Sequence, residues 1–261
     1  MDNKKNLLFG IKTAIVISVS ILAMVGMTLS PTIPQDQYYH HFADQRSVLG
    51  IAGFWNVVSG IPFLIVGALG MATLSGKTRL ALLHRMLPAY RAFFLAVFLV
   101  GLGSGYYHLA PSDATLVFDR LPMALAFMSL FAIIVSEFVS EKAGRGLFLP
   151  LLLSGLFSVG YWYFTELEGE GDLRLYVLVQ FLPMLLIPLI LLLFCPRFSH
   201  TSLIWTALGV YLLSKIAEMT DGLIYQAFGV ISGHTLKHLL AALSAYLFLL
   251  ALQKRKSVTT C

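Results

Sequence analysis

Three stretches of this chain place side chains that can bind a metal at the ends of long apolar runs. The first ends at His108, the second carries Asp119, and the third carries His234 and His238. Ionisable groups at membrane depth are costly, so each is a candidate functional residue. Three histidines and a carboxylate are also the inventory of a catalytic zinc site, in which three protein ligands leave a position for water and the carboxylate acts as its base.

The spacing of these residues supports a shared site. His234 and His238 are four residues apart, so both imidazoles project from one helical face, and a shared metal ion is the simplest use of such a pair. Ser104 precedes His108 by the same interval, which places its hydroxyl one turn deeper on the same stripe. Haem ligation is excluded for the pair, because haem takes its axial ligands from opposite faces of the macrocycle.

The other polar residues have simpler interpretations. Four further histidines read as interfacial anchors, and Lys237 is expected to extend its side chain outward to the interface. Those four are His40, His41, His84 and His200.

Three polar features within the spans receive separate predictions. Asn56 and Ser59 lie one turn apart, and interhelical hydrogen bonding and a functional role both remain open for them. Lys215 and Glu218 are three residues apart and are expected to neutralise each other. Arg120 is expected to pair with an acidic loop.

The composition indicates an integral membrane protein. Hydrophobic residues make up 58% of the 261 residues and charged residues 12%, whereas a soluble chain carries about 25% charge. The net charge of +5 comes from scattered Lys and Arg, with no basic block suited to nucleic acid, so no nucleic-acid partner is expected.

Apolar runs of about 20 residues predict an all-α architecture of eight membrane spans. The predicted spans are 10–29, 50–74, 90–109, 117–138, 147–165, 174–194, 201–217 and 234–252. The first could be a signal peptide, but its apolar core is long and no A-x-A-like cleavage site follows it, so an uncleaved anchor is expected.

The distribution of Lys and Arg predicts the orientation of the spans. With strict alternation, one side receives Lys4, Lys5, Lys12, Lys77, Arg79, Arg85, Arg91, Lys142, Arg145, Arg197, Lys254, Arg255 and Lys256. The loops of the other side hold only Arg46 and Arg174, among Asp36, Asp44, Asp113, Glu166, Glu168, Glu170, Asp172 and Asp221. Both termini are therefore expected in the cytoplasm, and the three histidines and Asp119 at one depth on the exoplasmic face.

Three sequence blocks together resemble one family. In chain order they read IAGFWNVVSG, GLGSGYYHLAPSDATLVFDRLPM and GHTLKHLLAALSAY. They are similar to the F-W-N-x-V-S, G-x-G-S-x-x-x-H with D-E-L-P-M, and H-x-x-x-H motifs of the alkaline ceramidase family, within the membrane hydrolase superfamily that includes the adiponectin and progestin receptors. The resemblance spans about residues 44–252, with motif order and spacing in agreement.

The resemblance implies a zinc amidohydrolase that cleaves ceramide or a similar N-acyl lipid taken from the bilayer. His108, His234 and His238 would hold Zn²⁺, Asp119 would orient or deprotonate the zinc-bound water, and Ser104 would hydrogen-bond the water or the developing oxyanion. The reaction releases a fatty acid and an amine lipid. Whether Asp119 acts as base or as a fourth ligand stays open.

The resemblance also implies a division of the chain. A seven-transmembrane-helix hydrolase bundle over 44–252 would follow an N-terminal anchor and exoplasmic linker over 1–43. A basic cytoplasmic tail over 253–261 would complete the chain.

Two departures from the family pattern matter. Arg120 replaces an acid of the D-E-L-P-M motif, and Gly53 replaces a Glu that binds calcium in eukaryotic members. Asp44 remains, but most calcium ligands do not, so no equivalent calcium site is expected. Short loops favour a bacterial member of the inner membrane, whose lipid need not be ceramide.

Two other classes of function stay open at this point. A receptor or signalling protein would hold a structural zinc, although structural sites usually have four protein ligands. A proton-coupled or small-molecule transporter would be expected to show broken helices in paired repeats, and the sequence contains no evident repeat.

Overall fold

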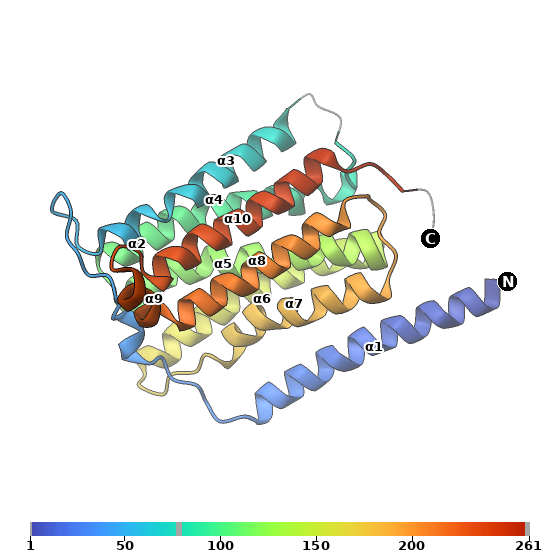
Figure 1. Cartoon of the computed structure of the whole chain (residues 1–261). Coiled ribbons are helices and arrows are strands. Elements are labelled where there is room, and N and C mark those ends of the chain that lie inside the picture. The colour runs from blue at the N-terminus through green and yellow to red at the C-terminus, as the bar shows by residue number, and fades with distance from the viewer. Residues whose placement is uncertain (1, 77–79, 259–261) are drawn as a thin grey trace.

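The computed structural model describes residues 2–76 and 80–258 as a helical bundle (Figure 1). The α-helices are α1 (Asp2–Leu29), α2 (Phe54–Val58), α3 (Ile61–Ser75), α4 (Leu87–Leu109), α5 (Asp113–Ile134), α6 (Glu141–Leu167), α7 (Arg174–Leu193), α8 (Thr201–Met219), α9 (Asp221–Phe228) and α10 (Gly233–Lys254). Two 3-10 turns, η1 (Gln37–His40) and η2 (His84–Met86), and a π-helical segment, η3 (Val135–Val139), complete the order.

The prediction of eight spans is confirmed. Eight helical segments within the described residues are long and apolar enough to cross a membrane, and each overlaps one predicted window. The chain is a multi-pass membrane protein of the all-α class. Lys77 and Arg79, which entered the charge analysis, lie outside the described residues.

The second span begins later than expected, at Phe54 rather than at residue 50. The preceding residues form a tight turn, in which Gly50 and Gly53 adopt the left-handed φ values of +79° and +58° that glycine accepts without strain. The short helix α9 was not predicted, because eight residues give too little periodicity to read.

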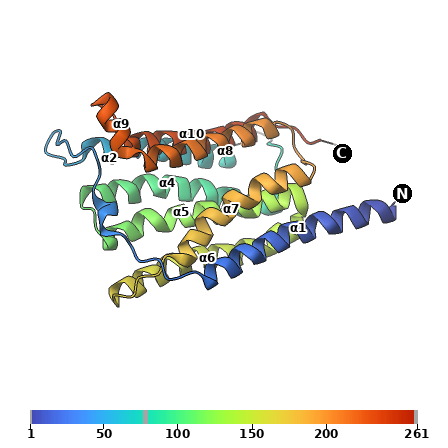
Figure 2. The same ribbon diagram turned by 60° about the horizontal axis from the view of Figure 1, so that its bottom comes forward.

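Seven spans pack against one another, and α1 lies beside them along α7 (Figures 1 and 2). No residue in the apolar window of α1 is buried within the protein, which suits a helix surrounded by lipid. Helix α1 begins and α10 ends at the same end of the bundle (Figure 1).

The close approach of α4 to α5 depends on one glycine. A Cβ atom at Gly103 would overlap the backbone carbonyl oxygen of Phe118, so only glycine allows these helices to pack as they do. Their neighbours in sequence, Ser104 and Asp119, are thereby brought to one level of the bundle interior.

Candidate metal centre

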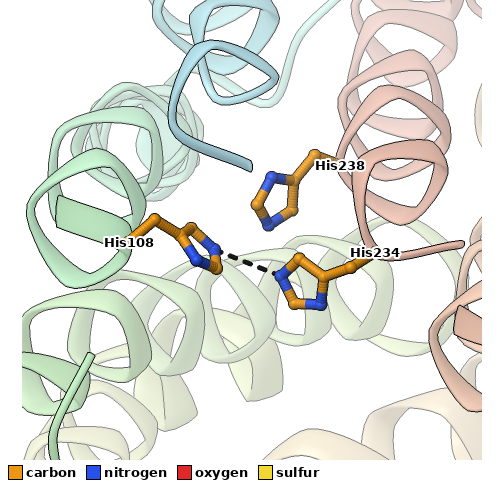
Figure 3. A group of neighbouring side chains, drawn as sticks. All are labelled: His108, His234 and His238. Carbon is orange, nitrogen blue, oxygen red and sulfur yellow. Dashed lines mark hydrogen bonds between the residues drawn. The ribbon is translucent and has the colours of Figure 1, made fainter. Parts of the chain in front are cut away.

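Three histidines from two helices converge at one end of the bundle. His108 comes from the last turn of α4, and His234 and His238 come from the first two turns of α10 (Figure 3). All three side chains are buried, and one nitrogen from each lies within 4.8 Å of the other two. In an ideal tetrahedral zinc site with Zn–N bonds near 2.0 Å, ligand nitrogens are about 3.3 Å apart. The three residues therefore can hold a metal ion after small side-chain adjustments.

The contacts of the imidazoles fit a cation between them. The Nε2 atoms of His108 and His234 face each other at 3.1 Å, marked by the dashed line in Figure 3. Without a metal, one of these two nitrogens must carry a proton for the contact to be attractive. A bound cation would instead accept the lone pairs of both nitrogens. The Nδ1 atom of His108 is buried and has no hydrogen-bond partner among the described residues.

Ser59 fixes the orientation of the third imidazole. Its hydroxyl donates to the backbone carbonyl of Asn56 at 3.0 Å, so it accepts a hydrogen bond from Nδ1 of His238 at 2.8 Å. The proton of His238 therefore resides on Nδ1, and Nε2 is left as a ligand atom directed at the triad.

Ser104 and Asp119 lie beside the triad, as the sequence predicts. Both are buried, the hydroxyl of Ser104 lies 3.4 Å from Nε2 of His238, and the Asp119 carboxylate interacts with that hydroxyl. Asp119 lies outside the group of ligand atoms that the three histidines form in the described part of the chain.

The linker after α1 crosses the site. Residues 33–46 form this segment, which we call the strap. The ring of Phe42 packs against two imidazoles, with its centroid 4.6 Å from that of the His108 ring and 4.4 Å from that of the His234 ring. The strap therefore covers two of the three imidazoles with an aromatic side chain and shields them from water.

Polar contacts fasten the strap to the bundle. His40 binds the Tyr107 hydroxyl at 2.9 Å and the Asp113 carboxylate at 3.0 Å, so it does more than anchor the chain at an interface. The Asp221 carboxylate accepts from the backbone N–H of Ala43 at 2.9 Å and from that of His234 at 2.7 Å. The strap and the first turn of α10 thus share one acceptor.

Asp44 completes the strap. Its buried carboxylate accepts hydrogen bonds from Nε of Arg46 at 2.9 Å and from Nη2 of Arg46 at 2.6 Å, and its backbone carbonyl accepts from the side-chain amide of Asn56. These hydrogen bonds from Arg46 hold the pKa of the Asp44 carboxyl below its usual value. The Arg46 guanidinium therefore neutralises the charge of this buried carboxylate.

An apolar cavity extends from the triad into the bundle. Ser104, Asp119 and His238 line its polar end, and Ile134 and Phe248 line the other. Asp119 and Ile134 are 15 residues apart on α5, which is about 22 Å along a helix axis.

Two predictions about charged residues were wrong. Lys237 does not reach outward; its side chain is buried, forms an ion pair with Glu218 at 2.5 Å, and lines the cavity. Arg120 does not pair with an acidic loop. It donates to the side-chain oxygen of Gln35 in the strap at 2.6 Å and packs over the ring of Trp162. The expected pairing of Lys215 with Glu218 is confirmed.

Three residues that support the site were not assigned to it from the sequence. Ser59 was open between two roles, and nothing in the spacing of Phe42 or Asp221 pointed to the histidines. Asp221 lies 12 residues before the helix of His234, too far for the N-cap pattern, in which the capping residue directly precedes the helix. The contacts depend on how α10 and the strap pack, which local pattern does not specify.

Comparison with known proteins identifies the family. The sequence model of the family described as Ceramidase matches residues 46–213, well over half of the chain, so the chain belongs to the ceramidase family. As a member of that family it is an amidohydrolase of the membrane. The match includes Ser104, His108 and Asp119, whereas the two histidines of α10 lie beyond it. No curated protein and no solved structure matches the chain in the corresponding searches.

Proposed function

We propose that this protein is a zinc-dependent hydrolase that cleaves the amide bond of ceramide or a similar N-acyl lipid within the membrane. One observation carries the proposal: the three buried histidines converge, and one of them, His238, lines the polar end of an apolar cavity together with Asp119 and Ser104. Membership of the ceramidase family supports the amide as the bond that is cleaved.

His108, His234 and His238 would hold the zinc ion. Neutral imidazole nitrogens are preferred zinc ligands, and three of them leave a position open, as in catalytic sites. When bound, zinc acts as a Lewis acid toward the carbonyl and makes a neighbouring water more acidic.

Asp119 moves the proton in the proposed reaction. Its carboxylate accepts a proton from the attacking water as the water oxygen bonds to the carbonyl carbon. It then delivers that proton to the amide nitrogen as the C–N bond breaks, which yields a fatty acid and an amine. Its place outside the histidine group supports the role of base over that of a fourth ligand.

Ser104 stabilises the charge that develops on the carbonyl oxygen. Its hydroxyl is buried beside His238 and Asp119 and can donate one hydrogen bond to that oxygen. In a cavity without bulk water, such a donor contributes more than it would in solution.

The apolar part of the cavity would hold the acyl chain. Its lining below Asp119 and Ser104 is almost entirely aliphatic and aromatic, so an acyl chain that enters from the bilayer stays in an apolar medium. The Lys and Arg bias supports an orientation with both termini in the cytoplasm and the metal centre toward the exoplasm.

The proposal is tested by incubating the purified protein with a panel of N-acyl lipids, with and without a metal chelator, and measuring released fatty acid. We expect hydrolysis that the chelator abolishes and added zinc restores. Hydrolysis that proceeds unchanged in excess chelator would contradict the zinc requirement, and the absence of amide cleavage across the panel would contradict the activity.

A further inference from the structure

A second cluster of charged residues lines the same cavity. Lys215 and Glu218 come from α8 and Lys237 from α10; we call them the Lys-Glu-Lys cluster. The Glu218 carboxylate pairs with Lys237 through Oε1 at 2.5 Å and with Lys215 through Oε2. The side chains of the three are between 9% and 17% exposed, and both lysines line the cavity together with Asp119 and His238.

The charges of this cluster do not balance. Two ammonium groups share one carboxylate, which leaves an excess positive charge at the polar end of an otherwise apolar cavity. Asp119 also lines this end of the cavity, but within the described residues both lysines form their ion pairs with Glu218 and not with Asp119. An ionisable group at membrane depth is a functional-site hypothesis unless it is neutralised.

Packing alone does not account for the second lysine. One lysine and one glutamate would suffice to join α8 to α10, and a buried ion pair usually adds little to stability because desolvation offsets the attraction. The amide of a neutral lipid and its hydroxyl groups do not need a cation either. The excess charge does suit an anionic group on the ligand.

We propose that the Lys-Glu-Lys cluster binds a carboxylate next to the scissile amide, and that the substrates of this protein are N-acylated amino acids. The inference rests on the proposed amide hydrolysis. In an N-acyl amino acid the carboxylate is one carbon from the amide nitrogen, so an amide placed at Asp119 and His238 puts the carboxylate at the level of Lys237. A released fatty acid offers the same chemistry, and the test separates the two sources.

The substrate arm compares N-palmitoylglycine with N-palmitoylethanolamine, which differ by a carboxylate in place of a hydroxymethyl group. We expect kcat/KM to be at least about tenfold higher for the glycine compound, since charge-assisted hydrogen bonds are about twice as strong as neutral ones. In Lys215→Met and in Lys237→Met, the ratio of the two kcat/KM values falls to within about twofold of one. Lys237→Arg, which keeps the positive charge, retains the preference for the glycine compound.

Each Met variant leaves one neutral Lys–Glu pair, so neither buries an unpaired charge. Lys254→Met, at the exposed far end of α10, is the matched control and keeps the preference. A ratio near one in the unmodified protein, or a preference that both Met variants retain, would overturn the substrate class.

The binding arm measures palmitate against hexadecanol and does not depend on turnover. Tighter binding of palmitate that Lys215→Met abolishes, without a preference for the glycine substrate, assigns the cluster to the product and overturns the N-acyl amino acid class. Equal binding of palmitate and hexadecanol would overturn the carboxylate site itself. Failure to cleave any amide contradicts the proposed function instead, and the binding arm then still decides whether the cluster binds a carboxylate.

Discussion

At the scale of single residues, the metal centre depends on hydrogen bonds behind the ligands as much as on the ligands. Ser59 holds the proton of His238 on Nδ1 and so leaves Nε2 for a metal. Such partners of metal-bound histidines typically affect metal affinity by 10- to 100-fold. We therefore propose that Ser59 orients a metal ligand in addition to joining two helices.

Ser59→Ala is expected to weaken zinc binding by about one to two orders of magnitude, because the imidazole loses its fixed tautomer and orientation. Competition with a fluorescent zinc chelator measures the dissociation constant. Ser158→Ala is the matched control: within the described residues, the hydroxyl of this buried serine donates only to the backbone carbonyl of Gly155 in its own helix. Equal zinc affinity in Ser59→Ala and the unmodified protein would contradict the assignment.

At the scale of elements, the strap joins α1 to the rest of the bundle and covers two of the three histidines. Phe42 packs on two imidazoles, and Asp221 bonds both the strap and the start of α10. Arg46 neutralises Asp44 within the strap through an ion pair. An internal ion pair thus fastens the strap.

Asp44→Asn is expected to destabilise the protein by about 1–3 kcal/mol at neutral pH, the cost of breaking buried hydrogen bonds to a charged group. Because the pKa of Asp44 is lowered in the folded protein, this contribution is present above the unfolded value near 3.9 and is lost as the pH falls through the lowered pKa.

Thermal unfolding in detergent between about pH 2.5 and 8 tests this expectation. The midpoint difference between the unmodified protein and Asp44→Asn should be constant above about pH 5 and shrink in acid. Asp36→Asn, an exposed position in the strap, is the control. A difference that stays the same down to the lowest pH would contradict the role of the Asp44 carboxylate.

At the scale of the whole molecule, the bundle encloses a cavity whose polar end is the candidate metal centre. Helices α4, α5, α7, α8 and α10 all contribute to its lining. The cavity follows the long axis of the bundle, so its depth should limit the length of the acyl chain. Ala245 lines this cavity, seven residues beyond His238 on α10.

Ala245→Phe is expected to fill the deep part of the cavity and lower kcat/KM for a 16-carbon N-acyl chain by tenfold or more, while an 8-carbon chain is little affected. Assays of matched N-acyl lipids of the two lengths measure the ratio. Leu243→Phe, on the exposed face of the same helix, should leave it unchanged. Equal losses for both lengths would exclude the cavity as the site of the chain.

Much of this molecule could be predicted from its sequence, because the membrane limits what the chain can form. Apolar runs specify spanning helices, and spacing specifies which residues share a helical face. The structure brings His108, His234 and His238 together as that reasoning predicts.

Contacts between elements were less predictable. Lys237 was predicted to extend outward, because a lysine near the end of a membrane span usually does. The side chain stays inside because Glu218 of α8 lies opposite, a fact that no local pattern contains. The contacts of Ser59 and Phe42 with the histidines were not predicted for the same reason, since they depend on how the helices and the strap are placed relative to one another.

The most direct test of the central claim is a zinc titration of metal-free protein, with zinc content and release of fatty acid measured together. We predict that activity rises in proportion to bound zinc and reaches its maximum at one equivalent. We also predict that Asp119→Asn binds one equivalent without appreciable turnover, and that His238→Ala shows neither tight binding nor turnover. Full activity in metal-free protein, or in Asp119→Asn, would contradict the central claim.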